Sequence, residues 1–111
     1  MHNEIVILVE NLDVCRYFYR EVLQIGQITW DSNYHVVFAL DENTDLVLEK
    51  NGGKYLEHAS GAVRFAFQCS DIPALNERLK KDGVPLSDGF ERLGKTCYRG
   101  NDPDGNVFYV F

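Results

Sequence analysis

An internal repeat is the feature of this 111-residue sequence that most restricts what it can fold into. If the first half is shifted by 60 positions onto the second, apolar residues fall on apolar residues and turn-forming residues on turn-forming residues, without a gap. Equivalent pairs include Leu12 with Ile72, Cys15 with Leu75, Tyr19 with Leu79, Trp30 with Phe90, Phe38 with Tyr98, and Val47 with Val107. Because residue classes agree while identities are almost absent, the pattern predicts two copies of one structural unit.

The first half has the pattern of a strand, a helix and three further strands. The β-branched run Ile5–Val9 predicts a strand that is covered on both faces. Asn11 can cap a helix over residues 12–23, whose apolar residues recur at three- and four-residue spacing. Three strands separated by turn-forming residues are then expected over 27–30, 34–40 and 46–50.

The same order of elements is expected after residues 51–60, which are polar, contain glycine and are typical of a linker. A strand over 62–69 precedes a helix that Ser70 or Asp71 caps and Gly83 ends. Strands follow around 85–93, 95–99 and 106–111, with a tight turn at 102–105. We therefore predict a single domain over 1–111, made of a first unit (1–50), a linker (51–60) and a second unit (61–111).

The composition favours a soluble chain with one core. Hydrophobic residues make up 45% of it, which is enough to bury a core at this length. The formal net charge of −6 disfavours binding to nucleic acid or to an anionic membrane, because both attract basic surfaces. No stretch approaches the roughly 20 apolar residues of a membrane span.

Three cysteines, Cys15, Cys69 and Cys97, are odd in number and have no C-x-x-C spacing, so they indicate neither a disulfide framework nor a zinc site. Each lies in an apolar or strand-like stretch, which favours buried free thiols in a reducing compartment. The N-terminal apolar run is too short for a signal-peptide core. We expect a cytoplasmic protein.

Three motifs carry a resemblance to a known family. They are Val9-Glu10-Asn11-Leu12 at the end of the first strand, the helix signature RYFYREVL over 16–23, and the terminal DPDGNV over 102–107. Together with the duplication, they resemble the vicinal oxygen chelate superfamily of glyoxalases, bleomycin-resistance proteins and extradiol dioxygenases, over nearly the whole chain. The resemblance implies an α+β fold in which two tandem β-α-β-β-β units form curled mixed sheets around a cleft, often completed by a second subunit.

Alternation along the strands predicts which side chains face away from the helices. On the first strand Glu4 opposes the wholly apolar row of Ile5, Ile7 and Val9, and on the fifth strand Arg64 and Gln68 oppose a row that includes Phe65 and Phe67. The repeat makes Glu4 equivalent to Arg64 and Glu49 equivalent to Tyr109, with Phe111 continuing the last row. We expect a ligand-binding cleft lined by Glu4, Glu49, Arg64, Gln68, Tyr109, Phe111, Trp30 and Tyr98.

The resemblance implies that metal-dependent relatives carry their ligands at the positions of Glu4, Glu49, Arg64 and Tyr109. Only Glu49 matches the common pattern outright, and Glu4 could replace a histidine. Arg64 cannot ligate a cation, because its guanidinium stays protonated and has no lone pair to give. We expect no cofactor and no metal; if a divalent ion did bind, Glu4 and Glu49 would hold it.

Arg64 can instead anchor an anionic or carbonyl-bearing ligand, because a guanidinium donates paired hydrogen bonds to such groups. Aromatic side chains, Phe90 among them, would supply the apolar walls of the cleft. The alternative is structural: Arg64 neutralises the glutamates and the aromatic rings fill the core. Among the histidines, His2 is terminal, His35 is expected at an exposed strand edge and His58 lies in the linker.

Three functions follow from the resemblance and the residues. The first is a metal-independent homodimer that binds a small organic molecule, as bleomycin-resistance-like proteins do. The second is a metal-dependent glyoxalase-like lyase, isomerase or dioxygenase, in which Glu49, with Glu4 or His2, holds the ion and a glutamate such as Glu49 moves the proton. The third is a non-catalytic dimerisation or sensor module, whose cleft its own side chains fill.

Overall fold

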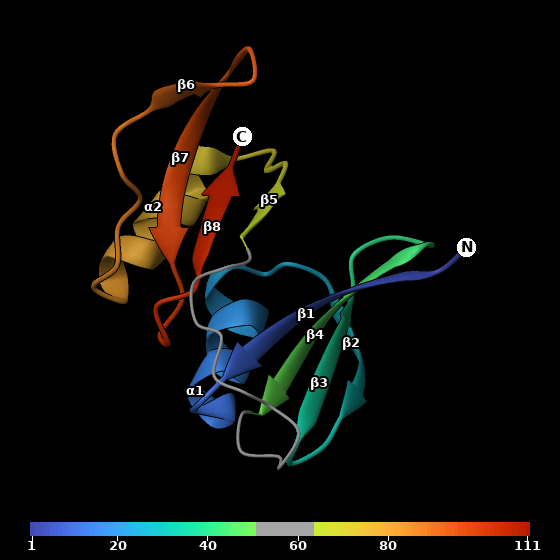
Figure 1. Ribbon diagram of the computed structural model, residues 1–111. Coiled ribbons are helices and arrows are strands. Elements are labelled where there is room, and N and C mark those ends of the chain that lie inside the picture. The colour runs from blue at the N-terminus through green and yellow to red at the C-terminus, as the bar shows by residue number, and fades with distance from the viewer. Residues whose placement is uncertain (51–63) are drawn as a thin grey trace. The chain divides into compact units, whose positions relative to one another are not determined.

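A computed structural model describes residues 1–50 and 64–111, and the chain divides into two compact units, Met1–Ser60 and Gly61–Phe111 (Figure 1). The linker expected over 51–60 lies outside the described residues. Each unit has a four-stranded mixed sheet and one helical segment, so the expected α+β fold is confirmed.

The first unit contains a sheet with the strand order β1-β4-β3-β2. Its elements are β1 (Asn3–Val9), α1 (Leu12–Tyr17), a π-helical turn η1 (Phe18–Val22), β2 (Gln27–Asp31), β3 (His35–Ala39) and β4 (Thr44–Lys50). Strands β1 and β4 run parallel, and the other neighbours are antiparallel. The helical segment lies between β1 and β2 in the chain, and α1 packs against β4.

The first helix begins as expected and ends differently. The Asn11 side chain accepts a hydrogen bond from the Val14 backbone N–H at 3.2 Å, so the expected cap is confirmed. The single α-helix expected over 12–23 is wrong in its second half, because the Leu23 N–H donates to the Phe18 carbonyl, five residues back. This wider turn buries Phe18 beside Tyr19, with their rings edge to face at 5.5 Å.

Arg16 fastens α1 to the turn between β2 and β3. Its guanidinium donates to the carboxylates of Asp13 and Asp31 at 2.6 and 2.9 Å, and to the Ser32 carbonyl at 2.9 Å. The Arg16 side chain is 17% exposed, whereas its carboxylate partners Asp13 and Asp31 are 90% and 44% exposed, so the two ion pairs are in contact with solvent. Arg16, the first residue of the helix signature, is thus a structural residue of the first unit.

The second unit repeats the strand order as β5-β8-β7-β6. Its elements are β5 (Phe65–Phe67), α2 (Ile72–Lys81), β6 (Phe90–Arg92), β7 (Lys95–Asn101) and β8 (Val107–Val110). Asp71 caps α2 by accepting from the Ala74 N–H at 3.1 Å, and Gly83 follows the helix at a φ of +81°. Both helix signals in the sequence are confirmed.

The repeat holds in topology but slips in register. Strand β1 pairs Ile5 with Leu46, so a gapless 60-residue shift would pair Phe65 with Asn106; instead β5 pairs Phe65 with Phe108. The Phe108 ring lies on Gly100 of β7, where an added Cβ would come within 2.3 Å of Cζ. A slip of two residues keeps every side chain on its expected face, because facing alternates with a period of two.

The region between α2 and β7 is less regular than expected. Of the strand expected over 85–93, only β6 forms. Pro85 has no N–H to give to a ladder, and the Leu86 N–H donates to the Asn76 side chain of α2 at 2.9 Å. The turn that follows β7 is confirmed: Asp102 is buried, and its Oδ1 accepts from the N–H groups of Asp104 and Asn106, both at 2.9 Å.

Two of the three cysteines, Cys15 and Cys97, are fully buried, Cys69 is partly exposed, and all three are free thiols. Within the described part of the chain, no helix has both the length and the apolar character needed to cross a membrane.

Candidate functional site

In each unit, one face of the sheet packs into the core with the helix. We call the opposite face the open face: it carries charged side chains together with one buried residue, Val47 in the first unit and Cys97 in the second. In the first unit the core face carries Ile7, Val9, Leu46 and Leu48, all buried. The open face carries Glu4 opposite Asp45, and Leu8 opposite Glu49, on the paired strands β1 and β4. Because successive side chains of a strand point to opposite faces, Glu4 of β1 and Glu49 of β4 share one face, at opposite ends of the paired strands.

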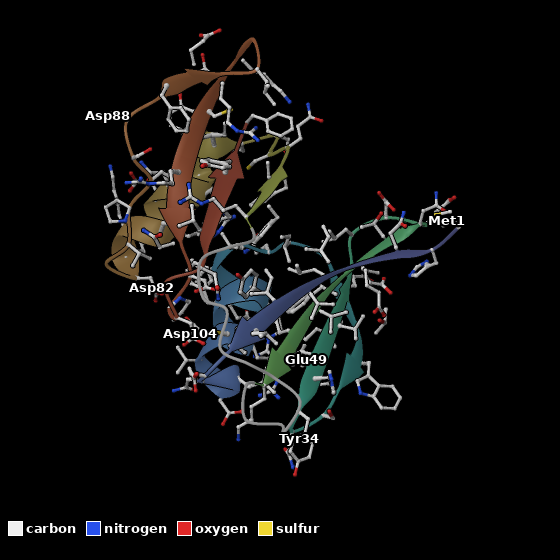
Figure 2. All side chains as sticks on the ribbon, viewed as in Figure 1. Met1, Tyr34, Glu49, Asp82, Asp88 and Asp104 are labelled. Carbon is white, nitrogen blue, oxygen red and sulfur yellow. The ribbon has the colours of Figure 1, made fainter. Side chains whose placement is uncertain are left out.

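Two histidine–carboxylate pairs lie on this open face. His35 Nε2 is 2.9 Å from Glu49 Oε1, across the ladder that pairs β3 with β4, and His2 Nε2 is 2.7 Å from Asp45 Oδ2. Figure 2 labels Glu49 on β4. We call Glu4, Asp45, Glu49, His2 and His35 the acidic face.

His35 is therefore not at the exposed edge that the sequence suggested. It lies on β3, an internal strand of the sheet, and its partner comes from the neighbouring strand. On the same face, hydrogen bonding to Asp45 and the negative charge of Asp45 raise the pKa of His2, and Glu4 adds to this effect.

The open face of the second unit has the opposite charge. Arg64 Nη1 donates to Tyr109 Oη at 2.7 Å, and the Arg92 guanidinium carbon lies 4.7 Å from the centroid of the Tyr109 ring. Phe90 meets the same ring edge-on at 5.9 Å. Arg99 is directly opposite Tyr109 on the β7–β8 ladder. Tyr109 is thus surrounded by three cationic side chains and an aromatic ring.

Lys95 and Phe111 extend this surface. Lys95 is paired with Arg92 on the β6–β7 ladder, and its Nζ lies 3.6 Å from the centroid of the Phe111 ring. We call Arg64, Phe90, Arg92, Lys95, Arg99, Tyr109 and Phe111 the basic aromatic face. Cys97 lies between Lys95 and Arg99 on the same face of β7 but is fully buried.

Among the residues that the structure describes, none of the four cations of the basic aromatic face forms an ion pair. Across residues 1–50 and 64–111, no carboxylate lies within ion-pairing distance of Arg64, Arg92, Lys95 or Arg99. The chain as a whole carries a net charge of −6. The positive charge on this face is therefore a local feature of the second unit.

The expected site residues are divided between the two units. Glu4 and Glu49 lie on the acidic face, whereas Arg64, Tyr109 and Phe111 lie on the basic aromatic face. Trp30 is 63% exposed on β2, paired with Val37 of β3, and Gln68 is exposed just after β5.

Tyr98 lies on the other face of its sheet from Tyr109. It is paired with the buried Val110, and its ring lies beside Gly89, 3.2 Å from where a Cβ would be. Together with Asn76 and Lys80 of α2, it lines a surface groove of about 890 Å³. The structure therefore does not bring Tyr98 together with the other expected residues of the second unit.

Sequence reasoning missed Arg92, Lys95 and Arg99. Lys95 and Arg99 occupy alternate positions of β7, so their shared face could have been read from the strand pattern. Arg92 could not be placed, because β6 is much shorter than the region that the pattern favoured. The cross-strand partner of His35 also depends on a register that only the structure provides.

The described residues do not fit a divalent metal ion at the four positions that the resemblance implies. Arg64 offers only donors, and it engages the Tyr109 hydroxyl. Glu49 is hydrogen-bonded to His35. In the parts of the chain that the structure describes, no three His, Cys, Asp or Glu side chains are placed to hold a metal ion together.

The two units define a class of protein: a tandem duplication of a β-α-β-β-β unit with the same strand order in each copy. The model of the Glyoxalase/Bleomycin resistance protein/Dioxygenase superfamily matches residues 2–110. The chain belongs to this superfamily. The resemblance found in the sequence is confirmed, although a comparison with curated proteins gives no match.

Solved structures share the fold at low sequence identity. A lactoylglutathione lyase from Agrobacterium tumefaciens has a TM-score of 0.73 at 19% identity, over 99% of this chain and 91% of that one. A glyoxalase/bleomycin resistance protein from a Streptomyces strain has a TM-score of 0.74 at 21% identity, over 99% and 98%. An integron cassette protein from the mobile metagenome of Halifax Harbour has a TM-score of 0.77 at 21% identity, over 99% and 96%.

Proposed function

We propose that this protein binds a small organic molecule without a metal ion. The observation that carries the proposal is the 2.7 Å hydrogen bond from Arg64 to Tyr109, at two positions where the family resemblance implies metal ligands. A guanidinium cannot give a lone pair and repels a cation, yet its paired donors suit a carboxylate or a carbonyl oxygen. Arg64 is accordingly the anchor of the ligand, and the aromatic rings beside it provide apolar contact.

The quaternary state and location belong to the same proposal. We propose a homodimer, as the family resemblance implies for binding members, in a cytoplasmic compartment. Three free thiols, two of them fully buried, suit a reducing environment. Analytical ultracentrifugation tests the first point, because a single monomeric species at micromolar concentration would contradict it.

Elemental analysis followed by a ligand screen tests the function. Tag-free protein dialysed against nickel, zinc and manganese should retain well under one equivalent of metal. Organic ligands should then raise the melting temperature by several degrees at concentrations far above the dissociation constant, because they bind only the native state. Arg64→Gln should abolish this shift, whereas Lys81→Gln on α2 should leave it unchanged.

Near-stoichiometric metal that Glu49→Gln removes would overturn the proposal. A ligand-induced shift that survives Arg64→Gln would separate ligand binding from Arg64 and reject this anchor. A third variant, Arg64→Lys, keeps the positive charge but loses the planar pair of donors. We expect this variant to bind the organic ligand at least about tenfold more weakly, since lysine cannot replace arginine in paired hydrogen bonding.

The hydrogen bond between His35 and Glu49 supports a second candidate, a lyase or isomerase in which Glu49 moves a proton. A carboxylate on an open face, held by a histidine, is a suitable general base. A lactoylglutathione lyase assay tests it. Turnover that Glu49→Gln abolishes and Lys81→Gln preserves would favour this candidate, and turnover unaffected by Glu49→Gln would reject it.

A further inference from the structure

We propose that the basic aromatic face binds a planar aromatic anion, that is, an aromatic ring bearing a carboxylate or a phosphate. This inference rests on the proposed small-molecule binding and names the chemical class of the ligand. It is carried by a juxtaposition confined to the second unit: four cationic side chains on the same sheet face as three aromatic rings.

The first step of the argument concerns Arg92. Its guanidinium carbon lies 4.7 Å from the centroid of the Tyr109 ring, a distance typical of a cation–π contact. Phe90 contacts the same ring edge-on, and Arg64 holds the Tyr109 hydroxyl. A guanidinium fixed in this way loses little further freedom on binding, and its N–H groups suit the two oxygens of a carboxylate or phosphate.

The second step concerns charge. Arg99 is the cross-strand neighbour of Tyr109, and Lys95 is the cross-strand neighbour of Arg92. These cations repel one another, and the described part of the chain gives none of them a carboxylate within ion-pairing distance. A bound anion relieves the repulsion. In an acidic protein, such a concentration of positive charge is explained by a ligand and not by the composition.

The third step concerns shape. Tyr109 and Phe111 are half-buried, and Phe90 is 36% exposed, so the rings that flank the cations remain partly accessible. The Arg92 guanidinium over the Tyr109 ring also offers a flat, weakly hydrated surface on which an aromatic ligand can stack. An aliphatic anion of equal charge would use the cations but would gain no stacking contact.

Four probes separate these contributions in titrations of the full-length protein, followed by amide chemical shifts. They are 2-naphthoate, 2-naphthyl phosphate, neutral 2-naphthamide and non-aromatic cyclohexanecarboxylate. We expect either aromatic anion to bind at least tenfold more tightly than the amide, since hydrogen bonds to charged groups are the stronger ones. Perturbed amides should cluster in β6, β7 and β8. Whichever of the two anions binds with the higher affinity shows whether the site prefers a carboxylate or a phosphate.

Variants assign the effect to the proposed residues. Arg92→Gln should weaken naphthoate binding about tenfold or more, and Arg99→Gln should also weaken it. Arg92→Lys preserves the charge and tests the planar guanidinium; it should lose less naphthoate affinity than Arg92→Gln. Lys81→Gln, on the helix, is the matched charge control and should bind naphthoate as the parent does. Raising the salt concentration should weaken the binding of the two aromatic anions and leave the binding of the neutral amide unchanged.

Each result bears on the inference. The inference would be overturned if the protein bound naphthoate and naphthamide with equal affinity. It would also be overturned if Lys81→Gln and Arg92→Gln lost the same naphthoate affinity, or if the perturbed amides lay outside β6–β8. If none of the four probes binds at millimolar concentration, the inference fails. The proposed function is judged separately, because a neutral or cationic ligand found in the wider screen and dependent on Arg64 would support it while rejecting an aromatic anion.

Discussion

The two units share a strand order but not the chemistry of their open faces. The acidic face of the first unit holds three carboxylates and two histidines, whereas the basic aromatic face of the second holds four cations and three aromatic rings. Their core faces, by contrast, carry the same kind of residue in both units, such as Phe38 and Phe108, each fully buried. Core packing therefore maintains the duplicated fold, and the open faces, which contribute little to the core, are free to differ in charge.

Deleting a fully buried ring from each core should give the largest effect and tests whether the two cores contribute similarly to stability. Phe38→Ala and Phe108→Ala should each lower the free energy of unfolding by about 3–5 kcal/mol, because each removes a fully buried ring and leaves a cavity. Urea denaturation followed by circular dichroism measures the change. A cost below about 1 kcal/mol for either variant would show that the two cores are not equivalent.

The turns before the last strand of each unit should differ in energy. Asp102→Ala should lower the free energy of unfolding by about 2–3 kcal/mol, since this buried carboxylate accepts from two backbone N–H groups and from the Asn106 amide. Asp41→Ala should cost only about 0.5–1 kcal/mol, because Asp41 is exposed and its carboxylate accepts a hydrogen bond from the Asn43 N–H. Equal costs in urea denaturation would contradict this difference.

The smallest effect is the pH response of His2 on the acidic face. Because Asp45 raises the pKa of His2 above its ordinary value of 6.5, the pair contributes stability fully below that value and loses it as the pH rises through the folded pKa. Histidine ring NMR measures the titration. Asp45→Asn should return the pKa toward 6.5, and Glu4→Gln should change it less. A larger change for Glu4→Gln would reassign the main cause.

Most of the fold could be predicted because the sequence signals are local. Alternation along β1, the caps at Asn11 and Asp71, and Gly83 after α2 each depend on a few neighbouring residues. The π-helical turn was not predictable from spacing, because burying both Phe18 and Tyr19 depends on the packed core. The register of β5 against β8 was not predictable either, because it pairs Phe65 with Phe108, which are far apart in the sequence.

The candidate site was predicted less completely for the same reason. Glu4 and Arg64 could be assigned to open faces by alternation alone, since one strand suffices for that inference. The partners of Glu49 and Tyr109 could not be predicted, because they come from other strands and depend on the register between strands. His35 comes from β3, and Arg92 comes from β6, which is shorter than its sequence pattern suggested.

The register slip between the two sheets has a consequence for how such a duplicated chain can diverge. The slip is two residues, and Phe65 and Phe108 still meet on the core side. A slip of one residue would have exchanged the buried and open rows along the strand. The pairing of the first and last strands of a unit, which run parallel, can therefore drift during evolution, or be redesigned, in steps of two residues. A single step must instead be absorbed by a bulge, such as the one between Ile28 and Trp30 in the antiparallel β2–β3 pair.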